Sequence, residues 1–186
     1  MKKWQILLIS IACLWSAISF ADDSSSVGLI RGFSGTDGSD GFGLTYKSYW
    51  GSLINFRNQW KLTGYWNSEL DYWKDNNSLN THYSNITIAS LTPTLRFTRQ
   101  FAYENGITPF IDAGYGVGVM NQQQFSDNQL GGYVTLRQTF GVGIQFGPQN
   151  QYDLAYHYVV FNNADILDHD DGLFMNTVEF DYYFSA

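Results

Sequence analysis

The residue types that could perform chemistry gather near the C-terminal end of the chain. Of the three histidines, His157 lies four residues after Asp153, and Glu179 follows on a later segment. A histidine beside a carboxylate has the composition of a general base and the group that orients it. These residues define one candidate site, and its value depends on whether a substrate can reach the His157 ring.

An acidic run is the second candidate, and it contains Asp165, Asp168, His169, Asp170 and Asp171. Carboxylates are ligands for divalent cations, but the spacing of these residues matches no calcium-binding loop. We interpret the run as a solvated acidic loop and predict no metal site and no cofactor. His169, like His157, stays a weak catalytic candidate.

The segments 152–163 and 173–184, which must position these groups, alternate with a period of two. In the first segment the apolar face carries Tyr152, Leu154, Tyr156, Tyr158 and Val160. The opposite face carries Asp153 and His157, and the second segment places Glu179 and Asp181 opposite aromatic residues. Alternation of this kind predicts strands that face two different media. An aromatic face without charge and a second face with carboxylates are typical of a transmembrane barrel.

Six earlier segments show related patterns, at about 27–33, 42–50, 60–73, 83–99, 107–120 and 133–146. The faces of the first are not assigned by its pattern. In the fourth, the apolar residues change from even positions, Ile86 and Ile88, to odd positions from Leu91 onward. A change of one residue predicts either a bulge near residues 89–90 or a loop end that reads as strand. The register of the first and fourth strands is left open by the sequence.

Eight strands of this length suffice to cross the hydrocarbon layer, and a sheet in lipid must close because its edges cannot meet water. We therefore predict an all-β fold, an eight-stranded antiparallel transmembrane β-barrel of the outer membrane. The loops 35–40, 74–82, 121–130 and 164–171 are expected at the cell surface, opposite the connections 51–58, 100–106 and 147–150.

The predicted inward face carries charges of both signs: Lys47, Lys61, Arg96 and Arg137 with Glu69, Asp71, Asp112, Asp153, Glu179 and Asp181. Because side chains just fill an eight-stranded barrel, we expect a packed ionic network rather than a pore. A sealed interior gives substrate no access to His157. We therefore interpret His157 as an interior residue with satisfied hydrogen bonds rather than as a catalytic base.

The N-terminal residues 1–21 have the pattern of a secretory signal peptide. Two lysines precede an apolar run that ends at Ser19-Phe20-Ala21. We predict cleavage after Ala21 and one barrel domain over residues 22–186. Without Lys2 and Lys3 the formal charge falls from −7 to −9, which argues against a nucleic-acid partner. Cys13 is the one cysteine, so the predicted mature chain has no disulfide.

Several separated motifs resemble the outer-membrane lipid A 3-O-deacylase (PagL) family. They are Trp60–Trp66 (WKLTGYW), Leu70–Trp73 (LDYW), Pro109–Gly116 (PFIDAGYG), Tyr158–Ile166 (YVVFNNADI) and Asp171-Gly172. The last two align without a gap along the family motif R-Y-x-H-Y-S-N-A-G-I followed by N-D-G. The resemblance covers about residues 42–184 and implies an eight-stranded barrel. It also implies hydrolysis of the ester-linked acyl chain at the 3-position of lipid A.

The family's catalytic groups are a serine nucleophile, a histidine base and a glutamate that orients the histidine. Carried over by position, the histidine falls on Val160, the serine on Asn162 and the glutamate on Phe174. None of these side chains can act as the group that it replaces. The chain retains the surrounding family residues, which we call the framework residues: Asn163, Ala164, Ile166, Asp171 and Gly172.

We therefore expect a catalytically degenerate member of the family that still contacts lipid A. One alternative is an active deacylase with a rearranged catalytic centre, which uses His169 or the nearby acidic residues with a serine or water. A further alternative is a small structural or adhesin-type barrel. The expected partners are outer-membrane lipids, lipid A among them, and the resemblance implies a homodimer. The expected location is the outer membrane of a Gram-negative bacterium.

Overall fold

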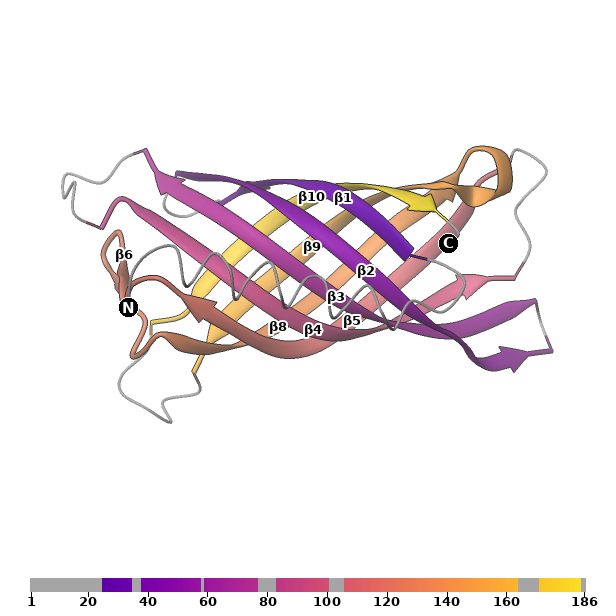
Figure 1. Cartoon of the computed structure of the whole chain (residues 1–186), viewed down its shortest axis with the longest axis horizontal. Coiled ribbons are helices and arrows are strands. Elements are labelled where there is room, and N and C mark those ends of the chain that lie inside the picture. The colour runs from indigo at the N-terminus through magenta and orange to yellow at the C-terminus, as the bar shows by residue number, and fades with distance from the viewer. Residues whose placement is uncertain are drawn as a thin grey trace.

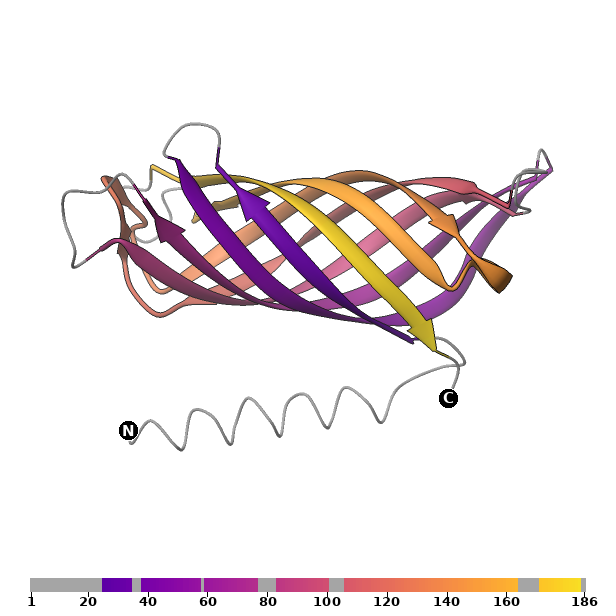
Figure 2. The same cartoon turned by 90° about the horizontal axis from the view of Figure 1, so that it is seen from above.

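Eight long antiparallel strands form a closed barrel in the computed structural model (Figures 1 and 2). The structure describes residues 25–34, 38–57, 59–76, 83–100, 106–163 and 171–184. The strands of the barrel are β1 (Ser25–Phe33), β2 (Ser39–Phe56), β3 (Trp60–Asp75), β4 (Asn85–Arg99), β5 (Thr108–Met120), β8 (Val134–Phe146), β9 (Tyr152–Asn162) and β10 (Leu173–Phe184). Sequential strands are neighbours around the wall, and β1 pairs with β10 to close it. The predicted fold class is confirmed, whereas the cleavage site and the limits of the domain stay predictions.

Two short elements lie between the long strands. A small hairpin, β6 (Gln124–Phe125) and β7 (Asn128–Gln129), follows β5, and a 3-10 turn, η1 (Pro148–Asn150), joins β8 to β9. Among the described residues no helix is long and apolar enough to cross a membrane.

The barrel wall is apolar outside and mainly polar inside. Exposed outward side chains include Leu29, Leu44, Leu70, Val117 and Val142, each from a different strand. The inward positions of the same strands bury Thr, Asn, carboxylate and basic side chains. Strands with these two faces are stable where lipid surrounds the wall and polar partners fill the interior.

The predicted bulge near residues 89–90 is wrong. β4 pairs with β3 in one uninterrupted register from Arg99 to Asn85. Ile86 and Ile88 are fully buried, on the same inward face as Thr92 and Arg96. The parity of the apolar residues changes because the interior itself becomes apolar toward this end of the barrel. The pattern in β1 is also resolved, since Val27 and Leu29 are exposed on the outward face.

The register shifts lie in the β2–β3 pair instead, between Tyr49 and Ser52 and between Ser52 and Ile54. Beyond them β2 continues to Phe56, so most of the predicted connection 51–58 is strand. The β2–β3 hairpin projects past the end of β10 in both views (Figures 1 and 2).

The two ends of the barrel differ. The connections β2–β3, β4–β5 and β8–β9 and the starts of β1 and β9 share the end where β10 finishes, whereas the other connections, including the longest, between β5 and β8, share the opposite end. Short turns are periplasmic and long loops extracellular in such barrels. At the extracellular end an apolar cluster, the outer plug, fills the interior with Trp73, Ile86, Ile88, Met120, Phe125, Leu130, Val159, Phe161, Leu173 and Met175. The predicted loop 121–130 thus contains a hairpin whose Phe125 packs into the barrel mouth.

Candidate functional site

The barrel interior contains the predicted ionic network, which is confirmed. Its cations contact carboxylates at 2.5–2.9 Å: Arg96 with Asp112 and Asp153, Lys47 with Glu179 and Asp181, and Arg137 with Glu69. All of these side chains are buried. Lys61, which was predicted with them, is only half-buried, at the periplasmic end of β3. Arg96 and Asp112 lie opposite each other on the neighbouring strands β4 and β5, whereas the other pairs join strands that are not neighbours in the wall and so link them through the lumen.

His157 belongs to this network and is only 5% exposed. Its Nδ1 lies 3.2 Å from Glu179 Oε2, and its Nε2 lies 3.6 Å from Asp112 Oδ2. Asp153, the other predicted neighbour, accepts instead from Arg96 and Tyr183. The ring therefore has carboxylate partners on both nitrogens and is enclosed by the described residues of the barrel, as expected for an interior residue.

The three positions onto which the motif resemblance would place the family's catalytic groups lie together on the outward face near the extracellular end. Phe174 of β10 is directly opposite Val160 of β9 in the register, and Asn162 lies two residues further on the same face of β9. Phe174 is 50% exposed. Antiparallel pairing brings side chains at directly opposite positions within about 5.5 Å. The fold thus brings an isopropyl group, an amide and a phenyl ring to neighbouring positions on one face.

Neighbouring outward positions add polar groups that the sequence analysis did not single out. Gln138 of β8 is opposite Val160, and the Tyr156 hydroxyl donates to Asn176 Oδ1 at 2.5 Å. The Asn162 Oδ1 atom is buried without a hydrogen-bond partner among the described residues. Within the described outward positions of β8, β9 and β10 there is no serine, cysteine or histidine. The pairing of β8 with β9 is the signal that could have identified Gln138.

The framework residues tie the extracellular loops to the edge of this site. Asp171 Oδ2 accepts a hydrogen bond from the Gln129 backbone N–H at 2.8 Å, and the Asp171 N–H donates to the Gln129 carbonyl at 2.9 Å. Asn163 Nδ2 donates to the Leu130 carbonyl at 3.4 Å. Gly172 has φ +70°, a conformation that side chains disfavour. Asn163, Asp171 and Gly172 therefore have a structural role whether or not catalysis occurs.

The remaining candidates, Ala164, Ile166 and His169, lie outside the described residues, as do Asp165, Asp168 and Asp170. Within the described part of the chain no group of three or more His, Cys, Asp or Glu side chains could hold a metal ion. The predicted absence of a metal site over 164–170 stays a prediction.

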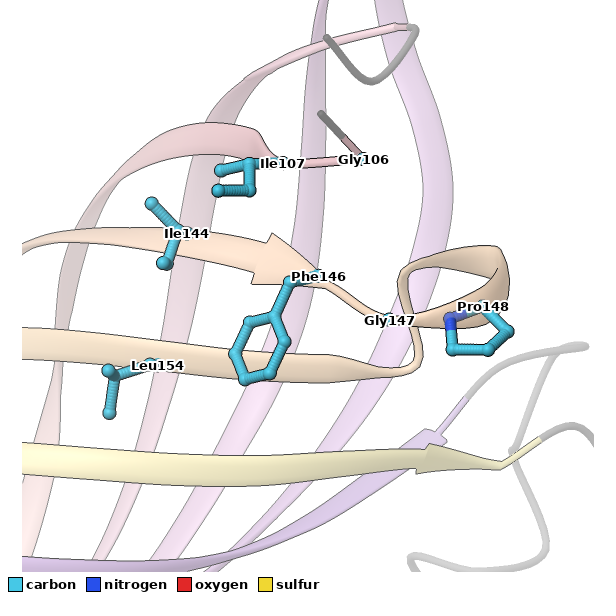
Figure 3. Close-up of a pocket in the computed structure, with 7 residues that line it drawn as sticks. All are labelled: Gly106, Ile107, Ile144, Phe146, Gly147, Pro148 and Leu154. Atoms are coloured by element: carbon cyan, nitrogen blue, oxygen red, sulfur yellow. The ribbon is translucent and has the colours of Figure 1, made fainter. Parts of the chain in front are cut away.

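A pocket of about 570 Å³ lies at the opposite, periplasmic end of the wall (Figure 3). It is lined by Gly106, Ile107, Ile144, Phe146, Gly147, Pro148 and Leu154. In Figure 3 the side chains of Ile107, Ile144 and Leu154 come from three neighbouring strand regions, and none carries a group that could act on an ester. This pocket is separate from the positions that match the family's catalytic groups.

A closed eight-stranded barrel with an apolar exterior and a charged interior defines an integral protein of an outer membrane. Residues 40–183 match the family described as Lipid A 3-O-deacylase (PagL), and the chain belongs to this family. It is 28% identical over 130 residues to the lipid A deacylase PagL of Pseudomonas aeruginosa, a match that covers 68% of this chain and 65% of that protein. The protein is located in the outer membrane of a Gram-negative bacterium.

Two solved structures have similar folds. The crystal structure of the outer membrane enzyme PagL aligns with a TM-score of 0.69 at 22% identity, covering 86% of this chain and 98% of that one. The crystal structure of Neisserial surface protein A (NspA) aligns with a TM-score of 0.51 at 8% identity, covering 88% and 95%. At these identities the likeness concerns the fold alone.

Proposed function

We propose that this protein is a non-hydrolytic member of the lipid A deacylase family that contacts lipid A through the outward face of β8, β9 and β10. The observation that carries the proposal is the juxtaposition of Val160, Asn162 and Phe174 on that face. The described framework residues Asn163 and Asp171 hold the neighbouring loop in place, but Val160 cannot accept a proton and Asn162 has no hydroxyl to activate. Phe174 cannot orient an imidazole.

Contact with lipid A is supported by the composition of the same face. Phe174 and Tyr158 are exposed apolar or aromatic surface, and Gln138 and Asn176 add amide groups beside them. Amides and tyrosine hydroxyls can form hydrogen bonds with the sugar and acyl-ester groups of a glycolipid, while the rings contact its acyl chains. The site lies at the extracellular end, where the outer leaflet meets the wall.

Mass spectrometry of lipid A from cells that produce the protein tests the proposal. The natural chain should leave lipid A unchanged. The triple variant Val160→His, Asn162→Ser, Phe174→Glu should remove a 3-hydroxyacyl chain, because it restores a base, a nucleophile and an orienting carboxylate at adjacent positions. The matched control is Val160→Ser, Asn162→His, Phe174→Glu, which has the same composition with nucleophile and base exchanged, and it should be inactive.

The outcomes separate the alternatives. Deacylation by the natural chain would refute the proposal and favour an active enzyme with a rearranged centre. If the triple variant folds in the outer membrane but leaves lipid A intact, the face does not hold lipid A as proposed. A structural or adhesin-type barrel would then be the better interpretation. Heat-modifiable gel mobility of each variant shows whether its barrel has folded.

A further inference from the structure

The periplasmic ends of β2, β3 and β4 carry a cluster of aromatic side chains on the outward face. Trp60 stacks on Phe97 with ring centroids 4.9 Å apart, and Phe56 meets Phe97 edge-on at 5.8 Å. Trp50 meets Trp66 edge-on at 5.5 Å. Tryptophan rings at the end of a membrane strand lie at the level of lipid headgroups. These five residues, the periplasmic aromatic cluster, mark the inner boundary of the membrane on this side of the barrel.

The β2–β3 hairpin extends this surface beyond the barrel rim (Figure 1). After the register shifts at Ser52, Ile54 pairs with Leu62 and Phe56 pairs with Trp60. Ile54 and Phe56 are both exposed. Apolar side chains on the outer face of a projecting hairpin are stable where they meet lipid rather than water. The hairpin thus offers a lipid contact at headgroup depth.

Two basic side chains flank the same hairpin, and we call Arg57 and Arg99 the basic rim. Arg57 lies in the turn, and Arg99 is opposite Trp60 on the outward face of β4. Lys61 shares the inward face of β3 with Tyr65 and is not part of the rim. The Arg99 guanidinium donates to Gln59 Oε1 at 3.0 Å. Residues 50–66 and 93–100 contain no Asp or Glu. This clustering of cations is unlike the rest of an acidic protein, whose extracellular connections are rich in Asp.

We propose that the basic rim and the periplasmic aromatic cluster bind an anionic glycerophospholipid of the periplasmic leaflet. The phosphate would lie between the cations, since guanidinium groups form their strongest hydrogen bonds with phosphate oxygens. The acyl chains lie along Ile54, Phe56 and Phe97. Basic groups next to membrane strands recognise anionic headgroups. The apolar face favours a lipid over a water-soluble partner, because it continues the lipid-facing wall. The site is at the opposite end from the proposed lipid A contact and does not depend on it.

Tryptophan fluorescence provides a direct test. Beyond residue 21 the chain contains Trp50, Trp60, Trp66 and Trp73, and the first three belong to the aromatic cluster. Trp73 is buried inside the barrel. The chain from Asp22 onward is refolded into phosphatidylcholine vesicles that contain either brominated phosphatidylglycerol or brominated phosphatidylcholine. Bromine quenches nearby indoles, so the quenching curves give the relative association constant of the anionic lipid.

The natural chain should prefer phosphatidylglycerol by at least about fivefold, the effect of a single cation near a charged membrane. The variant Arg57→Gln, Arg99→Gln should show a ratio of about one, as expected when no cation attracts the anionic headgroup. If this variant does not fold, Arg57→Gln alone, in the exposed turn, should still lower the preference measurably. The control Arg31→Gln, Lys74→Gln removes two exposed cations at the extracellular end and should keep the full preference.

Three results would overturn the proposal. The first is equal quenching of the natural chain by both lipids. The second is a preference that persists in the Arg57→Gln, Arg99→Gln variant or is lost equally in the extracellular control. The third is a reversal of the preference for phosphatidylglycerol when soluble glycerol phosphate is added at the same concentration as the vesicle lipid. This result would indicate a site for free phosphate rather than for a lipid.

Discussion

Replacing Arg96 by methionine should be among the most damaging single changes to this barrel. Its Nε and Nη2 donate to the two oxygens of Asp112 at 2.8 Å each, and its Nη1 donates to Asp153 and to the Tyr183 hydroxyl at 2.5 and 2.7 Å. The guanidinium also lies 3.6 Å above the Phe110 ring. Methionine retains much of this packing but removes the guanidinium from two buried carboxylates, of which Asp112 keeps only the more distant His157 ring as a basic partner.

The expected loss in the free energy of unfolding depends on which hydrogen bonds the two carboxylates retain. Breaking a buried ion pair by removing one partner costs about 3–5 kcal/mol, whereas replacing the whole set by neutral groups is often tolerated. Asp112 keeps the Tyr65 hydroxyl at 2.9 Å and Asp153 keeps the Tyr183 hydroxyl at 2.6 Å, which places Arg96→Met toward the lower end of that range. The triple variant Arg96→Met, Asp112→Asn, Asp153→Asn should recover most of the loss, because amides still accept from both tyrosines.

The assay is urea unfolding in phosphatidylcholine bilayers, with tryptophan fluorescence and heat-modifiable gel mobility as probes and linear extrapolation to zero denaturant. Arg96→Lys, which keeps the charge but not the planar fork, should fall between the natural chain and Arg96→Met. The reasoning is refuted if Arg96→Met costs less than about 1 kcal/mol, or if the triple variant is less stable than the single one, because the cost would then not come from uncompensated buried charge.

Three smaller changes test the interior and the extracellular loops. Gly141→Ala should lower the free energy of unfolding by about 1–3 kcal/mol, because the added Cβ would overlap with the His157 ring. In urea titrations, a second change, His157→Ala, should abolish this penalty. If the costs of the two changes are purely additive, the two residues are not in contact. Phe125→Ala should destabilise the outer plug by about 3 kcal/mol, and a loss below about 1 kcal/mol would mean that the hairpin does not pack in the barrel mouth. Asp171→Ala should speed proteolysis of the loop around Gln129 while the barrel stays folded, and Asp171→Asn, which keeps an acceptor oxygen, should not; identical cleavage rates would exclude the Asp171–Gln129 link.

The barrel itself could be predicted from the sequence because the signal for it is local. Outward residues contact lipid and most inward residues contact polar groups. The sequence of a single strand such as β9 therefore alternates between apolar and polar residues. The ionic network could be predicted from the same alternation. Side chains fill the lumen of an eight-stranded barrel, so buried cations such as Arg96 and Lys47 must contact carboxylates rather than water. The positions of Val160, Asn162 and Phe174 on one face followed from parity alone.

Only the tertiary structure determines the features that depend on contacts between strands and loops far apart in sequence. Ile86 and Ile88 face inward because they pack with Trp73 of the neighbouring strand and with Phe161 and Met175 of β9 and β10, and no local pattern in β4 contains that information. Likewise the role of Asp171 depends on a hydrogen bond to Gln129, 42 residues away in the chain. Period-two alternation identifies a strand and its two faces because both are properties of one segment. The chemistry that fills the interior, and the loops that close it, depend on contacts between segments far apart in sequence, which only the closed barrel brings together.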